Sequence, residues 1–245
     1  MARGLNLLEC YDEEHESFKA QEFVDRLEVP LSTVYRYLET LTEHKFLHKD
    51  PISKKYHLGI SIHRLGRLLG DESALVRVAL PFMQHLAKRS METVFLTVLA
   101  NGEAVCIKTI ESRQRIRLSI EEGAHQPLHA GASSRILLAY QTEAFIKKWM
   151  AANRLPRFTA ATICDEFEMT AVLKKTRQQG YTTSDSEVDE GSLAIAAPIL
   201  DANGKLVAGL SVAGPKTRLT GEIKPILIED IVITAKDISA ELQRR

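Results

Sequence analysis

Residues 20–44 read AQEFVDRLEVPLSTVYRYLETLTEH, which contains two short helical patterns separated by a proline. The first pattern covers 19–27, where four apolar residues fall on one helix face: Ala20, Phe23, Val24 and Leu27. Pro30 lacks the amide hydrogen that a helix interior needs, so the chain turns there. Ser32 and Thr33 can cap or open a further helix that runs to about His44. Its core-facing residues are Val34, Leu38 and Leu41.

Two short helices joined by a tight turn are typical of the helix-turn-helix, which lays its second helix in the major groove of DNA. The residues left facing solvent or DNA are Ser32, Thr33, Tyr35, Arg36 and Glu39. The planar guanidinium of Arg36 can bond guanine O6 and N7 together, while the neighbouring hydroxyls suit phosphate oxygens or base edges. Alternatively, Arg36 is a surface arginine that pairs with Glu39 one helical turn away.

The segment that follows predicts a hairpin of the kind called a wing. Strand patterns at 46–49 and 54–58 flank a turn at 50–53. Lys54 and Lys55 beside the turn can reach a phosphate backbone that flanks the groove. Exposed hairpin tips also carry lysine because open strand edges need charge, so these two residues alone indicate little. Helix, turn, helix and wing in this order predict binding to double-stranded DNA.

Charge is unevenly distributed, although 32 basic and 32 acidic side chains balance over the 245 residues. Residues 1–29 carry three basic against eight acidic side chains, and they include an expected short helix around Leu5, Leu8 and Tyr11. Residues 30–65 carry six basic against three acidic side chains, with four histidines besides. The second stretch is therefore the one suited to a phosphate backbone.

The composition excludes several other classes of protein. Hydrophobic residues make up 44% of the chain, enough to bury a core, yet no apolar run approaches the roughly 20 residues of a membrane span. The first residues lack the apolar stretch of a secretory signal, so we expect a cytoplasmic protein with no membrane partner. Cys10, Cys106 and Cys164 stand alone, which predicts no metal and no disulfide, and Cys106 is expected to be an inert core thiol. We expect no cofactor.

From residue 74 onward, alternating patterns predict an α+β domain with a mainly antiparallel sheet. The expected strands are 93–100, 103–110, 116–120, 193–200 and 205–212, with turns at 101–102 and 201–204. The expected helices are 75–89, 131–140, 143–150, 168–179 and 222–245, and apolar residues over 60–69 predict a further short helix before them. These patterns divide the chain into a DNA-binding domain at 1–65, a linker helix at 66–73 and a larger domain at 74–245.

The helix expected to open at Gly131-Ala132-Ser133-Ser134 is the clearest candidate binding site in the larger domain. Free backbone amides and the positive end of the helix dipole suit a carboxylate, and small side chains let a ligand approach. The same small residues equally suit tight packing of the helix on a sheet. His129 with Ser133 or Ser134 resembles a base with a nucleophile, but no third residue completes a triad. We therefore expect no catalytic residue and no enzyme.

Taken together, the chain resembles the IclR family of bacterial transcriptional regulators along nearly its whole length. The first domain carries VPLSTVYR at 29–36 and YHLG at 56–59, which resemble the winged helix-turn-helix of that family. The second carries PLHAGAS at 127–133, IAAPI at 195–199 and LSVAGP at 210–215, which resemble its GAF-like effector-binding domain. The resemblance implies dimers, or dimers of dimers, that respond to a small organic acid or an aromatic compound.

The resemblance also implies which residues form the effector pocket. Those that match are Leu128, Gly131, Ala132, Ser133, Asp185, Glu187 and Ser211. Members that respond to glyoxylate or pyruvate have a cysteine and a second serine where this chain has Ala194 and Ala213. Losing two polar groups makes the pocket more apolar, which favours a ligand larger than a two- or three-carbon acid.

The resulting hypothesis is a ligand-responsive repressor that binds operator DNA as a dimer. The ligand would shift how two recognition helices are spaced, through the segment between the two domains. Two alternatives remain open at this point. In the first alternative, the protein is an enzyme that uses the first domain only to dimerise. In the second, it is an architectural repressor whose second domain serves only oligomerisation and binds no ligand.

Overall fold

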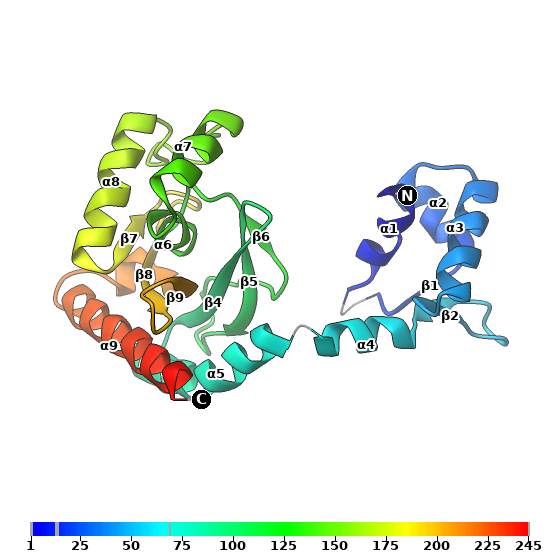
Figure 1. Cartoon of the computed structure of the whole chain (residues 1–245), viewed down its shortest axis with the longest axis horizontal. Helices are drawn as coiled ribbons and strands as arrows, with labels where there is room; N and C mark the ends of the chain where they lie inside the picture. Colours follow the sequence, from blue (N-terminus) through cyan, green and yellow to red (C-terminus); the bar gives the residue numbers. More distant parts are fainter. Residues whose placement is uncertain (1, 13–14, 69, 245) are drawn as a thin grey trace. The chain divides into compact units, whose positions relative to one another are not determined.

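A computed structural model describes residues 2–12, 15–68 and 70–244 of the chain (Figure 1). The chain divides into two compact units, Met1–Asp71 and Glu72–Arg245. Leu69, which belongs to the predicted linker at 66–73, lies outside the described residues. The α+β class with a winged helix-turn-helix and a mainly antiparallel sheet is confirmed.

The first unit contains the predicted helix-turn-helix and wing. Its elements are α1 (Ala2–Leu5), η1 (Leu8–Cys10), β1 (Ser17–Phe18), α2 (Ala20–Leu27), α3 (Leu31–Glu43), β2 (Leu47–Lys49), β3 (Tyr56–Leu58) and α4 (Ile60–Leu68). The helix expected around Leu5, Leu8 and Tyr11 is instead a four-residue helix followed by a 3₁₀ turn. The periodicity failed there because Leu7, which it left out, is fully buried, whereas Leu5 is exposed.

The wing of this unit has three strands, in the order β1-β3-β2, where two were predicted. Ser17 pairs with His57 and Phe18 with Tyr56. Phe18 also reaches the core, where its ring centroid lies 5.0 Å from that of Phe23. A two-residue strand is too short to show an alternation of apolar and polar residues, so the sequence pattern missed it.

The second unit contains a six-stranded antiparallel sheet in the order β6-β5-β4-β9-β8-β7. Its strands are β4 (Thr93–Ala100), β5 (Glu103–Ile110), β6 (His125–Gln126), β7 (Thr182–Asp185), β8 (Ser192–Leu200) and β9 (Leu206–Pro215). Its helices are α5 (Gly70–Ser90), α6 (Ala132–Ala139), α7 (Glu143–Ala152), α8 (Glu166–Gln179) and α9 (Ile223–Gln243), with a 3₁₀ turn, η2, at Lys216–Arg218.

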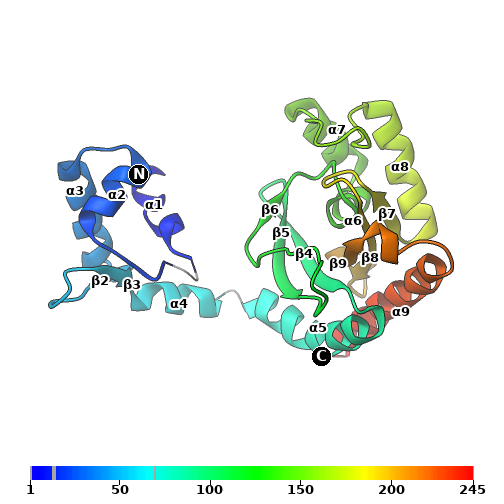
Figure 2. The same cartoon turned by 180° about the vertical axis from the view of Figure 1, so that it is seen from behind.

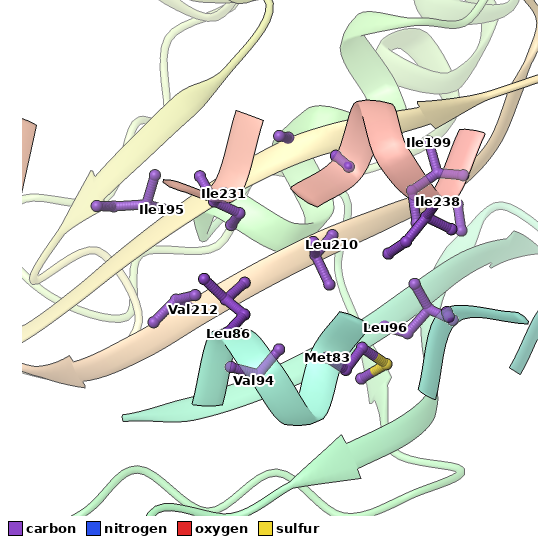
Figure 3. Close-up of a cluster of buried hydrophobic side chains, with 14 of the residues drawn as sticks. Met83, Leu86, Val94, Leu96, Ile195, Ile199, Leu210, Val212, Ile231 and Ile238 are labelled. Carbon is purple, nitrogen blue, oxygen red and sulfur yellow. The ribbon is translucent and has the colours of Figure 1, made fainter. Parts of the chain in front are cut away.

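Helices cover both faces of this sheet, α5 and α9 on one face and α6, α7 and α8 on the other (Figure 1). Figure 3 shows Met83 and Leu86 of α5 and Ile231 and Ile238 of α9 packed against the aliphatic side chains of the strands. Alternate residues of β8 serve the two faces. Large side chains such as Ile195 and Ile199 face α5 and α9, whereas Ala194 and Ala196 face the α6 side. At Ala194 and Ala196 the α6 face of β8 is therefore built from small residues.

The strand predicted at 116–120 was wrong, because this segment is irregular. Its apolar residues do pack inward: Leu118 and Ile120 contact a small cluster around Phe95. The backbone carbonyls of this segment accept hydrogen bonds from side-chain hydroxyls and not from a neighbouring strand. Thr93 Oγ1 donates to Leu118 O at 2.6 Å, and Thr109 Oγ1 donates to Ile120 O at 2.7 Å. Apolar content alone could not distinguish such a packed loop from a strand.

Candidate functional site

The second helix of the helix-turn-helix presents the residues predicted to contact DNA. Pro30 occupies the N-cap position of α3, so Ser32 and Thr33 lie in the first turn and do not cap the helix. Ser32, Tyr35 and Arg36 are exposed, and Thr33 is partly buried. Val34 and Leu38 are fully buried on the opposite side. The α3 surface that faces solvent is therefore polar, and it carries one basic residue, Arg36, beside the exposed Glu39 and Glu43.

Arg36 does not form the ion pair with Glu39 that its spacing allows. Among the described residues, the interaction of its guanidinium is with the ring of Tyr37, whose centroid lies 5.7 Å from Arg36 Cζ. A guanidinium held over an aromatic face keeps its in-plane N–H donors directed away from the ring. The geometry leaves the Arg36 fork available to a partner outside the chain.

The wing carries the two predicted lysines beside a tightly bonded turn. Asp50 Oδ1 accepts the N–H groups of Ile52 and Ser53 at 3.0 and 2.6 Å. Lys54 is exposed with a left-handed φ of 61°, and Lys55 is partly buried. Neither lysine forms an ion pair with another described residue, so both charges are open to a phosphate.

The second unit contains a cavity of about 360 Å³ beside the start of α6. Five of the predicted pocket residues line it: Gly131, Ala132, Ser133, Ala194 and Ala213. The sequence patterns did not identify the other lining residues, among them Phe95, Leu118, Ile120, Gln126, Ser184, Val188 and Ser192. The alternation in β4 was a usable signal, because Phe95 falls on the same sheet face as the small residues of β8 and β9. The loop residues gave no such signal.

The charged side chains and the hydrogen-bond donors around the cavity limit which ligands it can hold. Glu121 and Asp189 line it, and no lysine or arginine among the described residues does. Gly131, with φ 86°, begins α6 without a side-chain cap, so the first-turn amides of the helix have no capping side chain. Ser133 Oγ donates to Gln126 Oε1 at 2.9 Å. The N-terminus of α6 is therefore the feature of this lining that suits an anion, since no lysine or arginine among the described residues lines the cavity.

Four predicted pocket residues do not line the cavity. Leu128 is fully buried among apolar side chains, and Ser211 is buried with an Oγ that has no hydrogen-bond partner among the described residues. Asp185 pairs with Lys216 at 2.8 Å, and this hydrogen bond lowers the pKa of the Asp185 carboxyl. Glu187 is turned away into an ion pair with Arg135.

The ion pair between Arg135 and Glu187 links α6 to the loop after β7. The two side chains are only 2% and 8% exposed. Arg135 also donates to Thr183 O at 3.0 Å, and Glu187 Oε2 accepts the N–H of Gly131 at 3.5 Å. An arginine inside the apolar run 132–139 was the sequence signal for a buried acidic partner, and the prediction overlooked it.

The base and nucleophile considered from the sequence do not meet. His129 donates from Nε2 to Pro156 O at 2.9 Å and stacks on Phe158, while Ser133 bonds Gln126. Cys106 is buried, and burial raises the pKa of its thiol. In the part of the chain that the structure describes, no three His, Cys, Asp or Glu side chains gather as a metal site. None of the helices in that part has the length and hydropathy of a membrane span.

Comparison with known proteins matches both units to one family. Residues 70–240 match the family described as "Bacterial transcriptional regulator IclR C-terminal", and residues 1–51 match "IclR helix-turn-helix domain". The HTH-type transcriptional repressor AllR of Salmonella typhi is 32% identical over 242 residues, which cover 99% of this chain and 89% of the relative. The HTH-type transcriptional regulator KipR of Bacillus subtilis is 31% identical over 226 residues, covering 92% and 90%.

Solved structures share the fold. The IclR protein of Thermotoga maritima superposes with a TM-score of 0.78 at 25% identity, over 98% of this chain and 97% of that one. An IclR homolog from Microbacterium hydrocarbonoxydans, complexed with 4-hydroxybenzoate, gives a TM-score of 0.85 at 23% identity, over 100% and 99%. A helix-turn-helix with an exposed arginine and a separate unit with a cavity define a DNA-binding transcriptional regulator. This chain belongs to the IclR family of bacterial transcriptional regulators.

Proposed function

We propose that this protein is a repressor whose affinity for operator DNA is set by a small organic acid or aromatic compound bound in the second unit. The observation that carries the proposal is the cavity of about 360 Å³ at the uncapped start of α6. Its volume lies in the range of small-molecule sites in proteins, about 300–1,000 Å³. Relatives named as a repressor and a regulator support the regulatory half of the proposal.

The lining favours an aromatic or extended apolar compound with a single carboxylate. The first-turn amides of α6 suit one anionic group, whereas Glu121 and Asp189 oppose a second. Phe95, Leu118 and Ile120 offer apolar contact to the body of the ligand. A two-carbon acid would leave most of this volume unfilled.

The experiment that tests the function combines DNA binding with a ligand panel. The full chain is titrated onto the DNA upstream of its own gene at low ionic strength, in a gel-shift assay. Benzoate, 4-hydroxybenzoate, phenylacetate, glyoxylate and pyruvate are then added separately. We expect a shifted band. We also expect the affinity of the protein for DNA to change when an aromatic acid is added and to stay the same with the two short acids. The absence of any shift in all conditions would contradict the proposal.

Filling the cavity is expected to remove the response to ligand while leaving DNA binding intact. Ala194 lines the cavity and is only partly buried, so Ala194→Leu places its added methyl groups in free volume. A ligand at 100 times its Kd stabilises the wild-type protein by about 2.7 kcal/mol, and we expect this stabilisation to be lost. Differential scanning fluorimetry with the panel measures it. Ala240→Leu, on the exposed side of α9, is the control and retains the response.

We further propose that Ser32, Thr33, Tyr35 and Arg36 contact the major groove while Lys54 and Lys55 contact the flanking phosphates. In this arrangement the DNA-binding domain spans 1–65, with a linker helix at 66–73 and the effector-binding domain at 74–245. The protein acts in the cytoplasm as a dimer or a dimer of dimers and is not an enzyme. Analytical ultracentrifugation of the full chain tests the assembly, and a monomer at micromolar concentration would contradict it.

Neutralising the wing is expected to weaken binding to all DNA sequences alike. Lys54→Ala with Lys55→Ala removes two cations that form no ion pair with another described residue. The slope of log affinity against log salt then becomes shallower by about 0.9 for each lost phosphate contact. Fluorescence anisotropy with operator and unrelated duplexes measures both effects. A loss of affinity confined to the operator would contradict the phosphate assignment.

A further inference from the structure

The tip of the wing carries an isoleucine that contributes nothing to the fold. Ile52 is 91% exposed, the largest exposed fraction among the described large apolar side chains. Pro51 beside it is exposed as well. The loop between β2 and β3 projects away from the helices of its unit (Figure 2). Turns normally use glycine, asparagine, aspartate or serine at such positions, so the local structure does not require an isoleucine.

The tip is fixed by hydrogen bonds that leave only side chains to face a partner. Asp50 Oδ1 accepts the N–H groups of Ile52 and Ser53 and, at 2.8 Å, the hydroxyl of Ser53. Asp50 N donates to Lys55 O at 2.8 Å, and Lys54 N donates to Asp50 O at 3.0 Å. The backbone donors of the turn are therefore used within the turn. Pro51 and Ile52 form a preorganised apolar point.

The residues around Pro51 and Ile52 are mostly cationic. Lys49, Lys54 and Lys55 flank the turn, and Asp50 is the one acidic residue of the sequence stretch 44–70. One oxygen of that carboxylate, Asp50 Oδ1, accepts three hydrogen bonds from within the turn. An apolar tip flanked by lysines is complementary to a surface that has apolar walls between two rows of phosphates. The minor groove of duplex DNA is such a surface.

We infer that Pro51 and Ile52 form a wedge that enters the minor groove beside the segment contacted by α3 and reads how easily a base step unstacks. This inference rests on the proposed DNA-binding function. Proteins that kink DNA from the minor groove insert apolar side chains, isoleucine and proline among them, between base steps. Pyrimidine–purine steps such as TA and CA/TG unstack most readily. The wedge therefore selects such a step at a fixed distance from the recognised bases, without a base-specific hydrogen bond.

The test uses duplexes that the full-length protein selects from a random-sequence library. We expect a TA or CA/TG step to be enriched in the flank of the selected duplexes. Ile52→Ser should bind these duplexes about 5- to 50-fold more weakly, with an unchanged salt slope because no charge is removed. On duplexes with a stiff A-tract step at that position, wild type and variant should bind equally. A repeat selection with the variant should lose the enrichment.

Phe167→Ser is the matched control, because Phe167 is 84% exposed on α8 in the other unit. Its affinity should equal that of the wild type. Equal binding of Ile52→Ser and wild type to the selected duplexes would overturn the inference, as would a loss that is the same for every flanking step. An altered sedimentation coefficient of Ile52→Ser with intact DNA affinity would assign the tip to contact between copies. If the wild type selects no duplex, the DNA-binding function itself fails.

Discussion

Replacing Arg135 by methionine is expected to lower the free energy of unfolding by about 3–5 kcal/mol. The partner, Glu187, is 8% exposed, so the substitution leaves an unpaired carboxylate in the interior. The carbonyl of Thr183 loses its donor as well. Urea denaturation followed by the fluorescence of Trp149 measures the effect in the second unit, because the chain contains a single tryptophan and that residue lies there.

Two further variants separate the ion pair from general disruption. Combining Arg135→Met with Glu187→Met removes both charges, and we expect most of the lost stability to return. Arg117→Met breaks the exposed pair with Glu111, whose two side chains are 40% and 45% exposed, and should cost less than about 1 kcal/mol. A loss for Arg135→Met no greater than that of Arg117→Met would contradict the role assigned to the buried pair.

The second large effect is expected on operator binding. Arg36→Ala should weaken binding by about 1–3 kcal/mol, since a bidentate contact to guanine contributes about that much discrimination. The loss should be smaller on unrelated DNA, so the ratio of the two affinities falls. Anisotropy titrations with operator and unrelated duplexes at one salt concentration measure this ratio.

The charge-preserving variant Arg36→Lys distinguishes base reading from phosphate contact. Lysine keeps the charge but lacks the planar fork, so the loss of specificity should persist. Arg154→Ala removes one exposed charge from the second unit and serves as the control. Operator binding of Arg36→Ala equal to that of the wild type would contradict the placement of α3 in the major groove.

The elements with a clear period were predictable from the sequence. The strands at 93–100 and 103–110 have the predicted bounds, because their apolar runs end at the tight turn 101–102. The helix α8 also ends where Gly180 was expected to stop it, with a left-handed φ of 76°. Local turn chemistry fixes such boundaries, and it is visible in the sequence.

The cavity was only partly predictable because its wall comes from distant segments. The start of α6 was identified from its small residues and free amides, and the small residues of β8 and β9 were identified from the resemblance. The irregular segment 116–120 was taken for a strand, so its contribution of Leu118 and Ile120 was not foreseen. Glu187 was assigned to the pocket from the resemblance, and the arginine within 132–139 indicates a buried acidic partner without indicating that this partner is Glu187, 52 residues away. Tertiary partners of this kind have no period to reveal them.

The alternation along β8 and β9 separates two requirements that a sensor protein must meet. Side chains such as Ile195 and Leu210 hold the sheet to α5 and α9, while Ala194 and Ala213 line the cavity. Neighbouring positions in one strand therefore have different roles. One stabilises the fold, and the next determines chemical selectivity. A lineage can exchange alanine for serine or cysteine on the inner side without loosening the scaffold. One architecture can thus be retuned to many metabolites by a few substitutions.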